Sequence, residues 1–235
     1  MKPLILGSCY VADFAMRDLC QTWIRLAQHL HPGVDVLVVD SASPIAAFDG
    51  WIGNDCFLFH RFDDNVGHLS RGGGDGWGRA FCFGIEYAVE HNYTHIAYMD
   101  CDIMSRHPVT PILKKMAHRG VTVACPLDFH YQFVENGIAF METHYLQESG
   151  FIERYDWAHP PAAGAMAITE TPEARFEQIV ADDLFILPFR GCRNDFGQVT
   201  RSNIRDKFPF GCDYLTHCRD AGLYERFLEV NGIRL

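Results

Sequence analysis

The chain has 235 residues, of which 48% are hydrophobic and 21% charged, and its 20 basic and 30 acidic side chains give a formal charge of -10. This composition is typical of an ordinary globular protein and excludes disordered, collagenous and repeat chains. The basic residues form no stripe, so we expect no nucleic-acid partner.

The nine cysteines are an odd number, and several lie in apolar segments. They indicate neither a disulfide framework nor structural zinc. The chain starts with a strand-like segment instead of a signal peptide, and nowhere do eighteen apolar residues run together. We therefore expect a reduced, cytoplasmic protein.

Strand and helix patterns alternate along the first half of the sequence. Leu19, Trp23, Leu26 and Leu30 recur at helical spacing, whereas the segment 34–40 is almost continuously apolar, as in a strand buried on both faces. The predicted strands are 3–9, 34–40, 56–60, 95–99 and 121–125, and the predicted helices are 11–30, 77–90 and 108–118. A polar, glycine-rich loop is expected at 63–78. This alternation predicts a doubly wound parallel sheet.

Beyond Pro126 the alternation weakens. We expect a strand at 163–169, a helix at 171–180 and a helical tail at 213–230 that is broken near Gly222.

Two carboxylates, Asp100 and Asp102, bracket Cys101 directly after the fourth predicted strand. Ligands of open α/β sheets bind at this edge, and two hard oxygen ligands there can hold Mg²⁺ or Mn²⁺. The alternative is that both side chains cap the next helix or meet solvent. The position of the motif in the strand series favours the metal site.

Other polar residues lie at or near the same edge. Asp40 ends the second strand, where it can accept hydrogen bonds from a base or ribose or simply initiate a turn. Arg79 stands in the first turn of a helix, whose free N–H groups and positive charge suit a diphosphate, although Trp77 can equally pack on the core with Arg79 solvated.

Near the end of the chain, Asp213 and His217 stand four residues apart, on one face if this segment is helical. Asp213 is a candidate general base and His217 an additional metal ligand. The alternative for the pair is an N-cap aspartate beside a solvated histidine.

Together these residues resemble nucleotide-diphospho-sugar transferases of the GT-A fold, most like glycosyltransferase family 2. The likeness covers about residues 3–103, with a fainter echo at Asp213. The segment 40–43 is similar to the family's Asp-Asp-Gly-Ser turn, 65–67 to its Asn-x-Gly, 83–88 to its Gly-Ile-x-x-Ala helix, and 100–102 to its metal-binding Asp-x-Asp. Ser41 and Cys212 replace acidic residues of the family, and Arg79 lies two places from the usual arginine.

The resemblance implies an α/β fold of GT-A type (Rossmann-like), with a mostly parallel central sheet flanked by helices in a single compact domain. Residues 1–125 would form the nucleotide-sugar-binding half, and 126–235 the acceptor side with the C-terminal helix. The implied donor contacts are Ser8, Tyr10, Asp40, Asn65, Arg79 and Asp100. The implied metal ligands are Asp100, Asp102 and His217, and Asp213 would be the catalytic base.

The implied activity is metal-dependent transfer, of hexosyltransferase type, from a UDP- or GDP-sugar to a glycan, a lipid-linked or another hydroxyl acceptor, with Mn²⁺ or Mg²⁺ as cofactor. A membrane-borne acceptor would require peripheral membrane contact. If the enzyme inverts, Asp213 deprotonates the acceptor, whereas in retaining GT-A enzymes, which the segments 76–79 and 99–104 also resemble, no protein base is needed. Two alternatives are a nucleotidyltransferase of related fold and a catalytically inactive carbohydrate- or nucleotide-binding protein.

Overall fold

The structure is a computed structural model that describes residues 1–48, 55–67, 74–128, 133–159, 172–193, 199–208, 211–216 and 220–235. The strands are β1 (Pro3–Cys9), β2 (Asp35–Asp40), β3 (Phe57–Arg61), β4 (His95–Met99), β5 (Met104–Ser105), β6 (Val123–Asp128), β7 (Phe133–Val134), β8 (Ile138–Glu142), β9 (Leu184–Leu187), β10 (Gly191–Arg193) and β11 (Tyr214–Thr216). The helices are α1 (Phe14–Leu30), α2 (Gly74–Glu90), α3 (Val109–Arg119), α4 (Thr143–Glu148), α5 (Phe151–Tyr155), α6 (Pro172–Val180), α7 (Ile204–Lys207) and α8 (Ala221–Val230).

In the described part of the chain, eight strands form the central sheet in the order β3-β2-β1-β4-β8-β6-β7, with β9 paired to β6. The four strands β1 to β4 are parallel to one another, and β9 is parallel to β6, whereas β8 runs antiparallel between β4 and β6. This arrangement confirms the expected α/β fold with a mostly parallel central sheet flanked by helices in a single domain.

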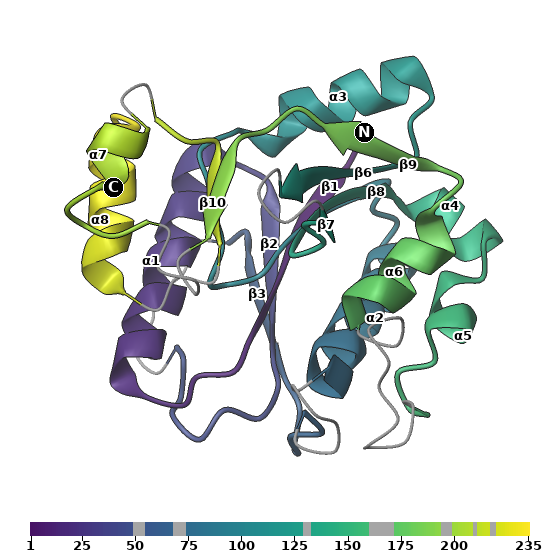
Figure 1. Cartoon of the computed structure of the whole chain (residues 1–235). Helices are drawn as coiled ribbons and strands as arrows, with labels where there is room; N and C mark the ends of the chain where they lie inside the picture. Colours follow the sequence, from purple (N-terminus) through teal and green to yellow (C-terminus); the bar gives the residue numbers. More distant parts are fainter. Residues whose placement is uncertain are drawn as a thin grey trace.

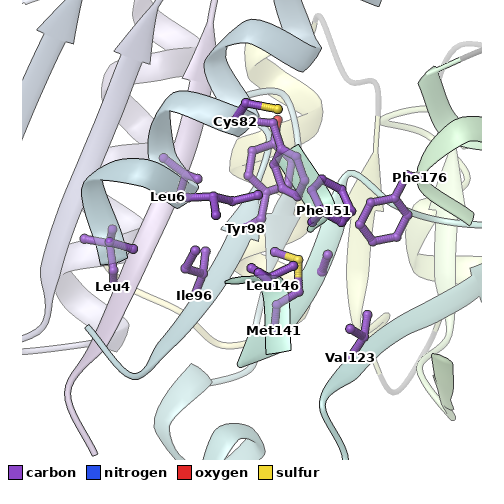
Figure 2. Close-up of a cluster of buried hydrophobic side chains, with 14 of the residues drawn as sticks. Leu4, Leu6, Cys82, Ile96, Tyr98, Val123, Met141, Leu146, Phe151 and Phe176 are labelled. Carbon is purple, nitrogen blue, oxygen red and sulfur yellow. The ribbon is translucent and has the colours of Figure 1, made fainter. Parts of the chain in front are cut away.

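Helices cover both faces of this sheet because its central strands are apolar on both sides (Figure 1). On one face α2 packs with α4, α5 and α6, and their side chains enclose one buried cluster with Leu4, Leu6 and Tyr98 (Figure 2). On the other face, α1 and α3 enclose a second cluster with Ile5 and Val38. None of the described helices has the length and apolar character needed to cross a membrane.

Helix α2 approaches β1 closely at Gly84. A Cβ built at this glycine would lie 2.2 Å from Leu6 Cδ2, which is closer than real Cβ contacts. The glycine therefore lets the helix sit directly on the sheet, and this contact sets the height of the first turns of α2 above the ends of β1 and β4.

A second, three-stranded sheet has the order β10-β11-β5 and corrects the prediction for the end of the chain. The expected helix over 213–230 is wrong at its start, because residues 214–216 form β11 antiparallel to β5, and the helix α8 begins at Ala221. A three-residue strand is too short to show a period in the sequence, and its antiparallel partner β5 lies more than a hundred residues away.

The start of α2 and the presence of β8 also differ from the prediction. Helix α2 begins at Gly74 inside the expected loop of 63–78, since the glycines there weaken the helical signal. Strand β8 was not predicted, and it separates β4 from β6, which the sequence pattern places in succession. The strand expected at 163–169 lies outside the described residues.

His31 lies where the end of α1 meets the start of α3, and its burial there makes the stability of the fold depend on pH in the acid range. It is the C-cap of α1, is 4% exposed, and its Nδ1 lies 3.4 Å from the Val109 N–H at the start of α3. Burial lowers the pKa of His31 from its ordinary value of 6.5 to about 4. The histidine is therefore neutral in the folded protein near neutral pH.

We expect the free energy of unfolding to fall as the pH is lowered from 6.5 toward 4. In this window the unfolded state binds a proton at His31 that the folded state excludes, which costs up to ~3 kcal/mol. His31→Asn should flatten this slope in urea titrations at several pH values, since asparagine keeps an acceptor but does not titrate. The exposed His118→Asn is the matched control and should keep the wild-type slope; equal slopes in both variants would contradict the assignment.

Candidate functional site

The carboxyl ends of β1, β2 and β4 meet at one edge of the sheet. Cys9 pairs in register with Asp40, and Leu6 with Tyr98, so the residues that follow these positions lie side by side. The Cys101 N–H donates to the Ser8 carbonyl at 3.2 Å, which continues the β1 to β4 ladder past the end of β4. Asp100 is therefore placed next to Ser8, as the sequence predicted for this edge.

Asp100 is held by donors from three different elements. Its Oδ1 accepts hydrogen bonds from Ser8 Oγ of β1, at 2.7 Å, and from the Tyr98 hydroxyl of β4. Its Oδ2 accepts from Trp77 Nε1 of α2, at 3.2 Å. These three donors are neutral, and together they orient the half-buried carboxylate.

Trp77 reaches Asp100 because the first turns of α2 pack tightly against aromatic side chains. Its ring stacks on Phe81, with centroids 4.9 Å apart, and meets Tyr98 edge-on at 5.7 Å. A Cβ on Gly78 would lie 2.4 Å from Tyr155, so the glycine admits Tyr155 to this cluster. The sequence predicts only a core position for Trp77, because its hydrogen bond to Asp100 joins a helix to the end of a strand and leaves no periodic signal. The Tyr98 contact was detectable, since residues two apart on a strand share a face.

The surroundings of Asp100 and Asp102 fit a hard divalent cation in their chemistry. A Cβ on Gly137 would lie 2.3 Å from Ile103 Cδ1, 3.2 Å from Glu135 Oε1 and 3.3 Å from Asp100 Oδ2, so the glycine lets these three side chains approach the backbone here. Carboxylate oxygens are the ligands that Mg²⁺ and Mn²⁺ prefer. Within the described ranges, however, no group of three His, Cys, Asp or Glu side chains is close enough to hold a metal, and the predicted third ligand, His217, lies outside them.

Asp40 is completely buried and initiates the turn after β2. Its Oδ1 accepts from the Ser43 N–H at 2.9 Å and from Ser43 Oγ at 2.5 Å, and Ser43 Oγ in turn accepts from the Val11 N–H at 2.7 Å. Arg61 Nε lies 3.7 Å from its Oδ2. These contacts favour the turn-initiating alternative, and contact with a base or ribose stays a prediction.

The other predicted donor contacts are spread around this edge. Tyr10 follows β1 and is 42% exposed, as a side chain that stacks on a ligand must be. Asn65 Oδ1 accepts from the Gly67 N–H at 2.8 Å and so shapes its own turn. Arg79 forms an ion pair with Asp64 at 2.8 Å and lies 3.8 Å over the Phe62 ring. Arg79 is therefore already partnered, and a diphosphate would have to compete with Asp64.

Asp213 is the hub of a separate ion-pair network. Its Oδ1 accepts from Arg106 Nη2 at 2.8 Å and His107 Nε2 at 2.7 Å, and its Oδ2 accepts from the Arg190 N–H at 2.6 Å. Burial acts to raise the pKa of Asp213, but the Arg190 N–H, His107 and Arg106 outweigh it and lower the pKa from its ordinary value of 3.8. A carboxylate held in this way is a weak base. The sequence pattern does not identify Arg106 or His107 as its partners.

The expected helical face shared by Asp213 and His217 is not formed, because Asp213 leads into the strand β11. The base role of Asp213 and the ligand role of His217 stay predictions. Their spacing of four residues no longer supports either of them.

A comparison with solved structures finds several glycosyltransferases whose fold is similar to that of this chain. The galactosyltransferase LgtC, in complex with donor and acceptor sugar analogs, has a TM-score of 0.61 at 14% identity over 98% of this chain and 95% of its own. A glycosyltransferase involved in glycosylation of the major capsid of PBCV-1 has a TM-score of 0.56 at 9% identity over 99% and 100%. GlyE of Streptococcus pneumoniae TIGR4 has a TM-score of 0.57 at 9% identity over 93% of this chain and 55% of its own. The chain thus has a GT-A-like glycosyltransferase fold.

No protein-family model matches this sequence, and no curated protein sequence does.

If Asp213 is structural, Asp213→Asn should lower the free energy of unfolding by ~1–3 kcal/mol, because it removes the charge that pairs with the partly buried Arg106 guanidinium. Urea unfolding at neutral pH measures this loss. Glu229→Gln is the matched control, since Glu229 pairs with Arg205 on the exposed surface, and it should leave the unfolding midpoint close to that of the wild type. A stable Asp213→Asn variant without sugar-transfer activity would instead support the base role.

Proposed function

We propose that this protein is a metal-dependent glycosyltransferase that moves a sugar from a nucleotide-diphosphate donor, a UDP- or GDP-sugar, to a hydroxyl group of a glycan, a glycolipid or another acceptor. The observation that carries the proposal is the Asp100 carboxylate, oriented by hydrogen bonds at the carboxyl end of β4, in a fold that resembles glycosyltransferases along nearly its whole length. Membership of glycosyltransferase family 2 and the hexosyltransferase type stay predictions.

Asp100 and Asp102 would hold Mn²⁺ or Mg²⁺, with His217 as a third ligand. The bound cation would offset the negative charge that develops on the departing nucleoside diphosphate. Ser8, Tyr98 and Trp77 would keep the Asp100 carboxylate oriented during this step.

The edge also offers ligand-facing groups for the rest of the donor. Tyr10 is exposed beside the ends of β1 and β2, where a base would lie. Asn136, next to Gly137, is 6% exposed, and its Nδ2 has no hydrogen-bond partner among the described residues. Buried donors in native proteins are nearly always satisfied, so this amide is a candidate donor to a bound sugar.

The contacts of Asp213 favour a mechanism in which it does not remove the acceptor proton. Its lone pairs are used by Arg106, His107 and the Arg190 N–H, and its pKa is lowered. Of the two stereochemical outcomes considered, the retaining one needs no protein base. We therefore favour retention of the donor's anomeric configuration.

Asp100→Asn and Asp102→Asn should each reduce release of nucleotide from the preferred UDP- or GDP-sugar by about 100-fold or more, because each removes a negative charge that binds the cation. They should also abolish the thermal stabilisation that Mn²⁺ with UDP or GDP confers on the wild type. Both substitutions keep the shape of the side chain. Glu86→Gln, an exposed acidic residue on α2, is the control and should retain both properties.

Full turnover in both aspartate variants would refute the metal-dependent mechanism. Heat of nucleotide-sugar binding without nucleotide release would indicate the inactive binding protein, and transfer of a nucleotidyl group would indicate the nucleotidyltransferase.

Trp77→Phe tests whether the indole orients Asp100. Phenylalanine can keep the stacking on Phe81 but has no donor for Asp100 Oδ2, so stability should change by only ~1 kcal/mol while the KM for Mn²⁺ rises several-fold. Melting curves and a Mn²⁺ titration of turnover measure the two effects. A large loss of stability with an unchanged KM would show that Trp77 serves packing alone.

A further inference from the structure

Three thiols lie together behind the turn that carries Asp100 and Asp102. Cys9 ends β1, Cys20 lies in α1, and Cys101 stands between the two aspartates. Side-chain hydrogen bonds link the three sulfur atoms, and all three cysteines are free. The proposed transfer reaction uses none of them.

The ladder between β1 and β4 places Cys9 opposite Cys101. The strand pairing ends with Leu6 opposite Tyr98, and the hydrogen bond from the Cys101 N–H to the Ser8 carbonyl continues the same register. Residues opposite each other on neighbouring strands have Cα atoms about 4.8 Å apart. This separation lies within the range of about 4.4–6.8 Å that disulfides span.

Both side chains point to the face of the sheet that α1 covers. Cys20 and Cys101 belong to the buried cluster on this face, and Cys9 packs against it. A Cβ at Gly7 would lie 3.1 Å from Cys101 Sγ and 2.6 Å from Trp23 Cη2, so Gly7 leaves room for these groups. Cys20 and Cys101 are 2% and 6% exposed, whereas Cys9 is only half-buried, and a small oxidant therefore reaches the cluster at Cys9.

We propose that Cys9 and Cys101 form a reversible disulfide under hydrogen peroxide and that this bond switches off the neighbouring aspartate pair. Peroxide first converts the Cys9 thiol to a sulfenic acid and releases one water. The Cys101 sulfur then displaces hydroxide from the Cys9 sulfur, its proton leaves with that hydroxide as a second water, and the S–S bond forms. Two thiols and one peroxide thus give one disulfide and two waters.

Cys20 holds the other two thiols in place. It accepts hydrogen bonds from Cys101 and Cys9, which lower its pKa to about 5. Cys20 is therefore a positioning group and does not join the disulfide.

The consequence for activity rests on the proposed function. Asp100 and Asp102 are the chain neighbours of Cys101, so a covalent bond to β1 changes the geometry of the turn on which both carboxylates lie. We expect the oxidised protein to lose most of its metal-dependent turnover and to regain it after reduction with dithiothreitol.

The test treats the full chain with hydrogen peroxide and maps the cysteine peptides by mass spectrometry. The expected result is a peptide pair joining Cys9 to Cys101 that has lost two hydrogen atoms and disappears on reduction. Cys9→Ala should prevent the bond and make turnover resistant to peroxide. Cys82→Ala removes a buried thiol of α2 on the opposite face and is the matched control, which should oxidise like the wild type.

Free Cys9 and Cys101 after treatment, or a disulfide that omits Cys101, would overturn the proposal. A Cys9–Cys101 disulfide that leaves turnover unchanged would overturn its control of the aspartate pair. Failure of the proposed function has a different signature, since the reduced wild type would then release no nucleotide from any donor, whereas the peptide map is read without reference to activity.

Discussion

The candidate site depends on one carboxylate, Asp100, whose direction is fixed by hydrogen bonds. Its donors include two hydroxyls and an indole N–H, supplied by β1, β4 and α2. Because these donors come from three elements, the carboxylate is oriented in this way only when α2 is docked on the sheet, and the glycines at 78 and 84 permit that docking.

Asp213 shows what the same side chain does in a different environment. It is buried, but Arg106, His107 and the Arg190 N–H supply the charge and hydrogen bonds that compensate for the lost water. Its contacts join the turn after β5 to the strands β10 and β11, so the small sheet is tied to the segment that follows Asp102. The carboxylate of Asp213 thus joins the small sheet to the turn after β5, whereas that of Asp100 accepts hydrogen bonds from hydroxyl and indole donors.

The sequence was informative where a signal is local and failed where a contact is made between distant segments. The apolar runs before Cys9, Asp40 and Asp100 predicted the parallel strands and the edge at which these residues meet. Strand β8 is placed by pairing with β4 and β6, and β11 by pairing with β5, so neither has a pattern that distinguishes it from its neighbours. The hydrogen-bond partners of Asp100 and Asp213 also lie mostly on other elements. The spacing of residues along the sequence therefore does not predict these contacts.

The position of the site follows from how the chain crosses the sheet. The connection from β1 to β2 runs through α1 on one face, and the connection from β3 to β4 runs through α2 on the other, so the chain changes face between β1 and β4 (Figure 1). Open α/β sheets have a crevice at such a point, outside the carboxyl ends of the strands. Ser8 and Asp100 stand there, and the Asp100 N–H donates to the Gly137 carbonyl at 3.0 Å. The segment that enters β8 therefore lies against the turn after β4 and brings Glu135 and its neighbour Asn136 close to Asp100.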